Sequence, residues 1–307
     1  MHSSDCKSGF VNVNGIRLHY LDWGGAGETL IFLTGMGYSA RIFGKFAKRF
    51  AGDFRVLALT RRGQGESDYP EIGYDVETLT DDIFKFMGAL HVDKAILAGH
   101  SMAGMELSHF AVTHPERVTK LIYQDAAYDR RDIAAIIESD PLKDVQPPYM
   151  KIVFSSIEEY GAYVKSIIPA FREIWDELWD SCIVFDLVKT PEGKYIEKDT
   201  NAIGNAMKQS LRTYVPEDPH IKIPVLSFFC THDHPDLPDY LTAEQRSLGI
   251  EHNKKWEAWR SGNIAKFRKD VPHAVVVVIP NGNHYCFVSH ADLVYEEMMK
   301  FLQGCDH

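Results

Sequence analysis

Residues 94–113 of the chain read KAILAGHSMAGMELSHFAVT, and this stretch decides the fold. An apolar run of strand length, Lys94 to Ala98, passes into Gly99-His100-Ser101-Met102-Ala103-Gly104, and a helical pattern continues to Thr113. A serine on such a sharp strand-to-helix turn needs small residues two positions before and after it, because the two backbones converge there. Gly99 and Ala103 meet this requirement, so the stretch predicts a reactive serine, Ser101, exposed at the edge of a sheet.

Strand and helix patterns alternate on both sides of this turn. The chain opens with a predicted β-hairpin, residues 10–23, folded at Asn14-Gly15. Further strands are expected at Thr29–Leu33, Arg55–Leu59, Lys94–Ala98, Thr119–Tyr123, Val225–Phe229 and Ala274–Ile279. Because helical periodicity separates most of these strands, the sequence predicts an α/β fold with a mostly parallel central sheet flanked by helices.

The alternation is interrupted between residues 129 and 219, where helical patterns dominate. We therefore expect an α/β core formed by residues 1–128 and 220–307, with residues 129–219 inserted as a helical lid. Within the insertion, an apolar stripe at helical spacing includes Phe171 and Trp175. This stripe either packs the lid onto the core or roofs an apolar substrate pocket, and both roles remain open.

A serine hydroxyl is a weak nucleophile at neutral pH and needs a base, which in turn needs an orienting acid. His284 follows the last predicted strand, at the edge of the sheet where α/β proteins place their sites, and is the predicted base. Two aspartates also follow strands. Asp233 is the preferred acid because it follows the penultimate strand, and Asp125, which follows the strand after the serine helix, is the alternative.

The oxyanion of an acyl-transfer intermediate requires hydrogen-bond donors. The backbone N–H of Met102 is one expected donor, and that of Met36, in the Thr34-Gly35-Met36-Gly37 turn after the first buried strand, is the second. Gly35 and His100 are expected to line the substrate pocket with the lid aromatics. A metal site at His232-Asp233-His234 is disfavoured because neighbouring residues of an extended loop point in different directions, and no metal or cofactor is expected.

These segments, together with Arg61-Arg62-Gly63-Gln64-Gly65-Glu66-Ser67, resemble the α/β-hydrolase superfamily over nearly the whole chain. The likeness is greatest to lid-bearing serine esterases, lactonases and proline-iminopeptidase-like members. It implies a catalytic triad of Ser101, His284 and Asp233, with oxyanion donors at Met36 and Met102. Asp233 and His284 stand 51 positions apart, an unusually long interval that predicts an extra helical excursion around Trp256 and Trp259.

Charge and cysteine content indicate which classes of binding partner and which cellular location to expect. The formal net charge of −10 and the lack of a basic block disfavour binding to nucleic acid or to an anionic membrane surface. Five scattered cysteines and an N-terminus without an apolar segment predict a cytoplasmic protein. A small-molecule substrate is expected, and the chain is expected to be a monomer or a homodimer.

The predicted activity is hydrolysis of a small-to-medium, apolar and uncharged carboxylic ester or lactone through an acyl-enzyme. Serine at position 101 argues against epoxide hydrolysis, which would use a carboxylate there. One alternative is an aminopeptidase for N-terminal proline, with Glu158-Glu159 or Glu173 and Glu177 holding the substrate amine. A ligand receptor that has kept the fold without catalysis is the alternative from another class.

Overall fold

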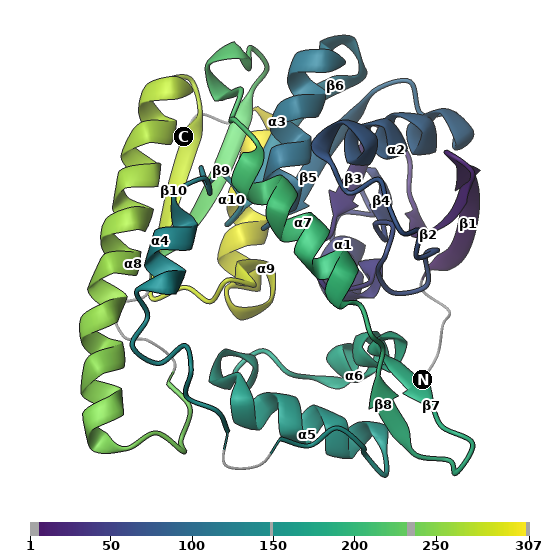
Figure 1. The fold of residues 1–307 in the computed structure, drawn as a ribbon. Helices are drawn as coiled ribbons and strands as arrows, with labels where there is room; N and C mark the ends of the chain where they lie inside the picture. Colours follow the sequence, from purple (N-terminus) through teal and green to yellow (C-terminus); the bar gives the residue numbers. More distant parts are fainter. Residues whose placement is uncertain (1–5, 148–149, 232–236, 305–307) are drawn as a thin grey trace.

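The computed structural model describes residues 6–147, 150–231 and 237–304 (Figure 1). Eight strands form one sheet in the order β1-β2-β4-β3-β5-β6-β9-β10. The pairs from β4 through to β10 are parallel, while β1–β2 and β2–β4 are antiparallel. The strands are β1 Lys7–Val13, β2 Ile16–Gly24, β3 Thr29–Leu33, β4 Arg55–Leu59, β5 Ala95–His100, β6 Val118–Gln124, β9 Val225–Thr231 and β10 Val275–Pro280. The predicted, mostly parallel α/β sheet is therefore confirmed.

The opening hairpin has the predicted turn. Val13 pairs with Ile16 across Asn14 and Gly15, whose φ angles of 51° and 74° are both positive. A two-residue turn of this kind matches the right-handed twist of the two strands, which is why an Asn-Gly pair folds there.

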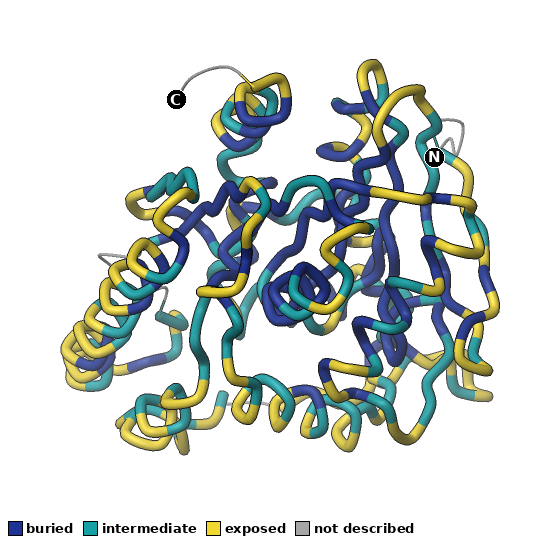
Figure 2. The backbone as a smooth tube through the Cα atoms, turned by 90° about the horizontal axis from the view of Figure 1, so that it is seen from above, coloured by how far each residue is buried: buried dark blue, intermediate teal, exposed yellow. Residues whose placement is uncertain are grey.

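Helices cover both faces of the sheet, and the residues of β5 show how the two faces differ. Leu97 faces α2, α3 and α8, while Ile96 and Ala98 face α1, α9 and α10. All three side chains are fully buried, and burying each large aliphatic side chain contributes about 1.5–3 kcal/mol. These helices are α1 Gly44–Lys48, α2 Val76–Ala89, α3 Ala103–Thr113, α8 Ala243–Asp270, α9 Cys286–Ser289 and α10 Ala291–Gln303. Figure 2 shows the buried residues gathered in the middle of the molecule and exposed positions on the outer helices.

The segment between β6 and β9 holds helices and one small hairpin. Its elements are α4 Ile133–Glu138, α5 Ile157–Ile167, α6 Glu177–Ile183, β7 Leu187–Lys189, β8 Tyr195–Glu197 and α7 Asn201–Thr213. In Figure 1, α5, α6 and the β7–β8 hairpin lie together away from the sheet, and α7 crosses in front of the core. The β7–β8 pair was not predicted from the sequence.

The 28-residue helix α8 is the predicted excursion before His284. Its N-cap is Thr242, whose side chain accepts a hydrogen bond from the N–H of Gln245, while the side-chain oxygen of Gln245 accepts one from the N–H of Thr242. This capping box satisfies N–H groups that lack a partner within the helix. No helix in the described part of the chain has the length and apolar character needed to cross a membrane.

Candidate active site

The backbone turn at Ser101 is as tight as predicted. Ser101 joins β5 to α3 with a φ of 55°, a left-handed conformation that residues other than glycine rarely adopt. A Cβ added to Gly99 would lie 2.9 Å from the Cβ of Ala103, and one added to Gly104 would lie 2.0 Å from the carbonyl oxygen of Ala126. The small residues around the serine are therefore required by the close approach of the backbone segments.

Three side chains from different strand ends form one hydrogen-bonded chain. The Oγ atom of Ser101 lies 2.9 Å from Nε2 of His284, and Nδ1 of His284 lies 2.6 Å from Oδ2 of Asp125. Because an ionised carboxylate only accepts hydrogen bonds, Nδ1 carries the proton and donates a hydrogen bond to Asp125. Nε2 is then free to accept the hydroxyl proton of Ser101, which is the arrangement of a general base beside a nucleophile.

The carboxylate of Asp125 is held at the end of β6, where its residue also has a positive φ, 50°. Its Oδ1 atom accepts from the hydroxyl of Tyr128 at 2.5 Å and from the backbone N–H of Cys230 at 2.9 Å. Burial disfavours the charged form, but the hydrogen bonds from His284, Tyr128 and Cys230 outweigh it and lower the pKa of Asp125 to about 2. Asp125 is thus ionised at neutral pH and fixes the orientation of His284.

The preferred acid from the sequence, Asp233, is not the carboxylate seen on His284. Asp233 lies outside the described residues, as do His232 and His234, and the contact to Nδ1 is made by the alternative, Asp125. The sequence kept Asp125 as the alternative acid because it also directly follows a strand. In the sheet β6 lies beside β5, which brings Asp125 to the same edge as Ser101.

The turn predicted to supply an oxyanion donor lies directly against Ser101. A Cβ on Gly35 would be 2.8 Å from Nδ1 of His100 and 3.0 Å from Cβ of Ser101, so only glycine allows this approach. Met36 follows Gly35 in this turn, and Met102 follows Ser101. Both methionine side chains join one apolar cluster with Met207 of α7, so the two residues lie on the same side of the nucleophile.

Buried polar residues brace this turn from behind. Arg61 makes a two-pronged ion pair with Glu106 at 2.6 and 2.8 Å, and its Nη1 donates to the carbonyl oxygen of Gly35 at 3.0 Å. The amide of Gln64, in the orientation that satisfies both of its ends, donates to the carbonyl of Gly35 at 3.1 Å and accepts from the N–H of Gly37 at 3.1 Å. Sequence reasoning did not assign this role to Arg61 or Gln64, although both lie in the Arg-Arg-Gly-Gln segment that carried the resemblance.

His100, which was expected to line the pocket, instead contacts the loop that carries His284. Its buried ring donates from Nε2 to the carbonyl oxygen of His284 at 3.0 Å and lies against the His284 ring, with 4.5 Å between centroids. Burial and the neighbouring His284 lower the pKa of His100 well below its usual value, so the ring stays neutral. Its Nδ1 edge faces Gly35, so the His100 side chain lies between His284 and the turn that contains Gly35.

Phe171 and Trp175 belong to an aromatic cluster between the insertion and the core. Phe171 contacts Tyr38, which follows the Thr34–Gly37 turn, at 6.2 Å and Tyr285, next to His284, at 5.7 Å between ring centroids. Trp175 packs on Phe171 at 6.0 Å and donates its indole N–H to Asp180 at 2.8 Å. The stripe therefore packs the insertion onto the core, and Phe171 reaches the residues that flank the reacting groups.

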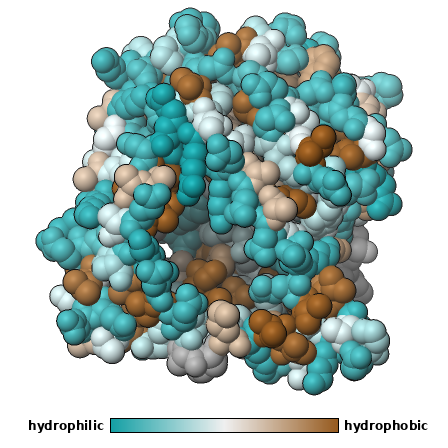
Figure 3. Space-filling view, in the orientation of Figure 1, coloured by the Kyte–Doolittle hydropathy of each residue, from teal (hydrophilic) through white to brown (hydrophobic). Residues whose placement is uncertain are grey.

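Of two cavities in the described structure, the smaller one reaches His284 and the larger one does not. A cavity of about 320 Å³ is bounded by His284 and Asn283 and by one side of α8, including Trp256 and Arg260. In the space-filling view a hollow opens between the insertion and the core, with apolar side chains inside it (Figure 3).

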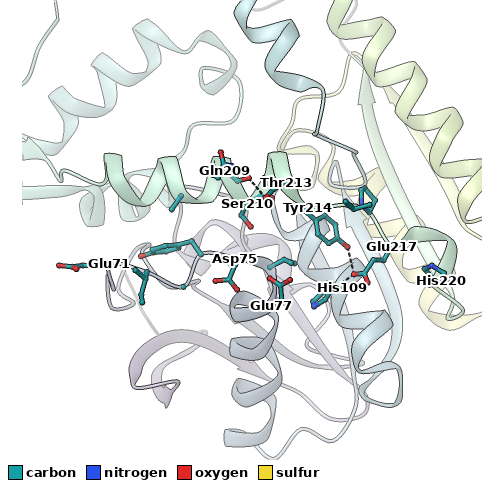
Figure 4. A pocket seen from close by; sticks show the side chains of 17 residues that line it. Glu71, Asp75, Glu77, His109, Gln209, Ser210, Thr213, Tyr214, Glu217 and His220 are labelled. Atoms are coloured by element: carbon teal, nitrogen blue, oxygen red, sulfur yellow. Dashed lines mark hydrogen bonds and ion pairs between the residues drawn. The ribbon is translucent and has the colours of Figure 1, made fainter.

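A larger cavity of about 810 Å³ lies between α7 and the helices α2 and α3 (Figure 4). Its side chains include Glu71, Asp75 and Glu77, and the ion pair of His109 with Glu217 at 2.7 Å. Neither Ser101 nor His284 lines it, so its size does not make it the reaction site. Within the described ranges, His, Cys, Asp and Glu side chains form no group of three that could hold a metal ion.

A family model described as the alpha/beta hydrolase family matches residues 30–297. The chain belongs to the alpha/beta hydrolase family. This assignment confirms the predicted superfamily and agrees with the sheet order and the serine turn. Family members catalyse many reactions on the same fold, so the reaction has to be argued from the site.

Curated proteins and solved structures resemble this chain over different shares of its length. N-formylmaleamate deformylase of Pseudomonas putida is 40% identical over 101 residues, which are 33% of this chain and 38% of the relative. Epoxide hydrolase 4 of Mus musculus is 36% identical over 118 residues, 36% of this chain and 32% of the relative. The matched stretch thus spans under two fifths of each of these relatives. A solved structure of E-2-(acetamidomethylene)succinate hydrolase is 21% identical, covers 97% of this chain and 99% of its own, and has a TM-score of 0.75.

Proposed function

We propose that this hydrolase cleaves a small-to-medium carboxylic ester or lactone through an acyl-enzyme on Ser101. The observation that carries the proposal is the unbroken chain from Ser101 Oγ to His284 Nε2 and from His284 Nδ1 to Asp125. In this mechanism His284 takes the serine proton as Oγ attacks the acyl carbon, and then gives that proton to the leaving alcohol. A water activated by the same imidazole releases the acid and restores Ser101.

The surroundings of Ser101 support acyl transfer. The backbone N–H of Met102, at the start of α3, and that of Met36 are the proposed donors to the oxyanion of the tetrahedral intermediate. Removing one such donor typically slows acyl transfer by about 10²–10³. The methionine side chains and Met207 of α7 give an apolar wall beside the nucleophile, and methionine adapts to substrates of varied shape.

Other reactions fit the site less well. Attack on an epoxide by an enzyme carboxylate would need an acid at position 101, where this chain has serine. For the aminopeptidase alternative, the carboxylate of Glu159 is already bound to Lys151 and to the N–H of Ser155 at 2.6 Å. Glu173 is exposed to solvent. The carboxylate of Glu159 is therefore already occupied and is not available to a substrate amine.

The residues between β6 and β9 are proposed to act as a lid over the site. The carbonyl oxygen of Ala170 accepts a hydrogen bond at 2.9 Å from the side chain of Asn283, next to the base. Movement of this segment would therefore shift Asn283 and, with it, the neighbouring His284.

The buried thiols of Cys182, Cys230 and Cys286, which form no disulfide, support the proposed cytoplasmic location.

The test is hydrolysis of p-nitrophenyl esters from acetate to decanoate, alongside prolyl-p-nitroanilide, by the purified protein and by Ser101→Ala. Ester turnover that disappears in Ser101→Ala supports the proposal, and the preferred chain length measures the pocket. Preference for the prolyl amide would support the aminopeptidase instead. Absence of all turnover in the intact protein would contradict a broad esterase and favour a receptor or a narrow specificity.

A further inference from the structure

One face of the long helix α8 supports the turn that carries the acid of the proposed triad. The ring of Trp259 stacks on that of Tyr128, with 5.0 Å between their centroids and 22° between their planes. One helical turn further on, Oδ1 of Asn263 accepts a hydrogen bond from the backbone N–H of Asp129 at 2.7 Å. The helical excursion predicted before His284 therefore contacts the segment after β6 through both a side chain and the backbone.

The phenol of Tyr128 is held in place by packing. Opposite elements contribute to this, because the ring of Phe229 on β9 meets the Tyr128 ring edge-on at 5.3 Å between centroids, while Trp259 stacks on it. The indole N–H of Trp259 is itself bound to Asp132 at 3.0 Å. With its ring fixed in this way, Tyr128 donates its hydroxyl hydrogen bond to Oδ1 of Asp125 at 2.5 Å.

The charge of Asp125 is shared among three donors. The residue is only 4% exposed, so these donors balance its charge in place of bulk water. Oδ1 accepts from the Tyr128 hydroxyl and from the backbone N–H of Cys230, and Oδ2 accepts from the imidazole of His284. A hydrogen bond to an ionised group stabilises its charge. The hydroxyl of Tyr128 therefore reduces the negative charge that acts on His284.

The Tyr128 hydroxyl remains a donor across the neutral pH range. Burial and the charge of Asp125 raise the pKa of Tyr128 well above its usual value, so the hydroxyl keeps its proton. Other titratable or charged groups also surround Asp125, Tyr128 and the His284 ring: His100, Arg130, Cys230, Arg260 and Tyr285. Removing the Tyr128 hydroxyl alters none of these groups, so a change in the protonation of His284 would report that hydroxyl.

We propose that Tyr128 is a positioning residue of the triad: held by Trp259 of α8, its hydroxyl takes up part of the charge of Asp125 and so keeps His284 a neutral base to lower pH. This inference rests on the proposed acyl hydrolysis and gives the extra helix a part in it. The reaction steps are unchanged, because His284 still takes the proton of Ser101.

The test is the pH dependence of kcat/KM for the best p-nitrophenyl ester. Tyr128→Phe removes the hydroxyl alone, so Asp125 becomes more basic and attracts the imidazolium form of His284 more strongly. The midpoint of the acidic limb should move to higher pH by about 0.5–1 unit. Plateau kcat and KM should each change by less than about 3-fold, because the N–H of Cys230 still holds the carboxylate. Tyr128 is also not among the described residues that bound the cavity beside His284.

A stronger donor at the same position should have the opposite effect. Replacing Tyr128 by 3,5-difluorotyrosine, whose hydroxyl donates more strongly, should move the midpoint to lower pH. Tyr123→Phe is the matched control, because Tyr123 lies on β6 and its buried hydroxyl is bound to Ser108 at 2.9 Å. This control should lower the melting temperature and leave the midpoint unchanged.

The role of α8 is tested by Trp259→Leu, which removes the ring stacked on Tyr128. The midpoint should shift in the same direction as in Tyr128→Phe, by a smaller amount. Combining the two substitutions should add no shift to that of Tyr128→Phe, because Trp259 acts through the Tyr128 hydroxyl. An unmoved or lowered midpoint in Tyr128→Phe, or additive shifts in the double variant, would overturn the inference.

Failure of this inference and failure of the proposed function give different results. If esters are turned over and Tyr128→Phe leaves the midpoint unchanged, the hydrolase stands and the role of Tyr128 falls. If no ester is turned over, an NMR titration of the His284 ring decides, with its signals assigned through their loss in His284→Gln. A titration midpoint that rises in Tyr128→Phe supports the inference, and an unchanged or lower one overturns it.

Discussion

Asp125→Asn should abolish most activity while leaving the fold intact, because of how the carboxylate is held. Oδ1 of Asp125 accepts from both Tyr128 and the N–H of Cys230, while Oδ2 accepts from His284. In asparagine the carbonyl oxygen will stay with the two donors, which turns the amide NH₂ toward Nδ1 of His284. Nδ1 must then accept, so the ring proton moves to Nε2 and the base can no longer accept a proton from Ser101.

The size of this effect follows from the loss of the correct tautomer, which in a serine triad lowers kcat by about 10⁴. That factor corresponds to about 5.4 kcal/mol of transition-state stabilisation. The assay is kcat for the best p-nitrophenyl ester at pH 7.5, with circular dichroism and the melting temperature as checks on folding. Asp233→Asn is the comparison, because Asp233 was the preferred acid from the sequence. A loss below about 10-fold in Asp125→Asn, or an equal loss in Asp233→Asn, would refute the reasoning.

Three further substitutions test other parts of the account. Gly35→Ala would place a Cβ 3.0 Å from Cβ of Ser101 and displace the oxyanion turn, so kcat should fall by about 10²–10³; unchanged kcat would show that the turn has no catalytic part. Arg61→Met leaves the buried carboxylate of Glu106 unpaired and should lower the free energy of unfolding by about 3–5 kcal/mol in urea titrations, with partial recovery in the double variant with Glu106→Met. Burial raises the pKa of Asp186 to about 7, whereas an unfolded aspartate ionises near pH 4, so ionisation costs stability as pH rises from about 4 to 7. Asp186→Asn should therefore raise the melting temperature at pH 8 and leave it unchanged at pH 4; a gain at both would contradict this.

The core was predictable because its local signals are strong and agree. The apolar run of β5, the small residues around Ser101 and the Asn14-Gly15 turn each follow from steric limits that act within a few residues. His284 was found in the same way, since it directly follows the last strand. In each case the residue type and its position along the chain determine the local structure.

The acid and the bracing residues depend on contacts between distant segments, which one sequence does not reveal. Both Asp125 and Asp233 follow strands, and the choice depends on the order of strands in the sheet, where β6 lies next to β5. Arg61 reaches Glu106 and Gly35 across 45 and 26 positions. The β7–β8 hairpin was missed because its strands have only three residues each, too few to show a period.

The most direct test of the central claim is to identify the atom that carries the acyl group. The protein is mixed with a p-nitrophenyl ester, quenched in acid within the first turnover and digested for peptide mass spectrometry. The account predicts one acyl group on Ser101, no acylated peptide from Ser101→Ala, and a matching burst of p-nitrophenol only in the intact protein. Acylation of another residue, or steady turnover by Ser101→Ala, would contradict Ser101 as the nucleophile.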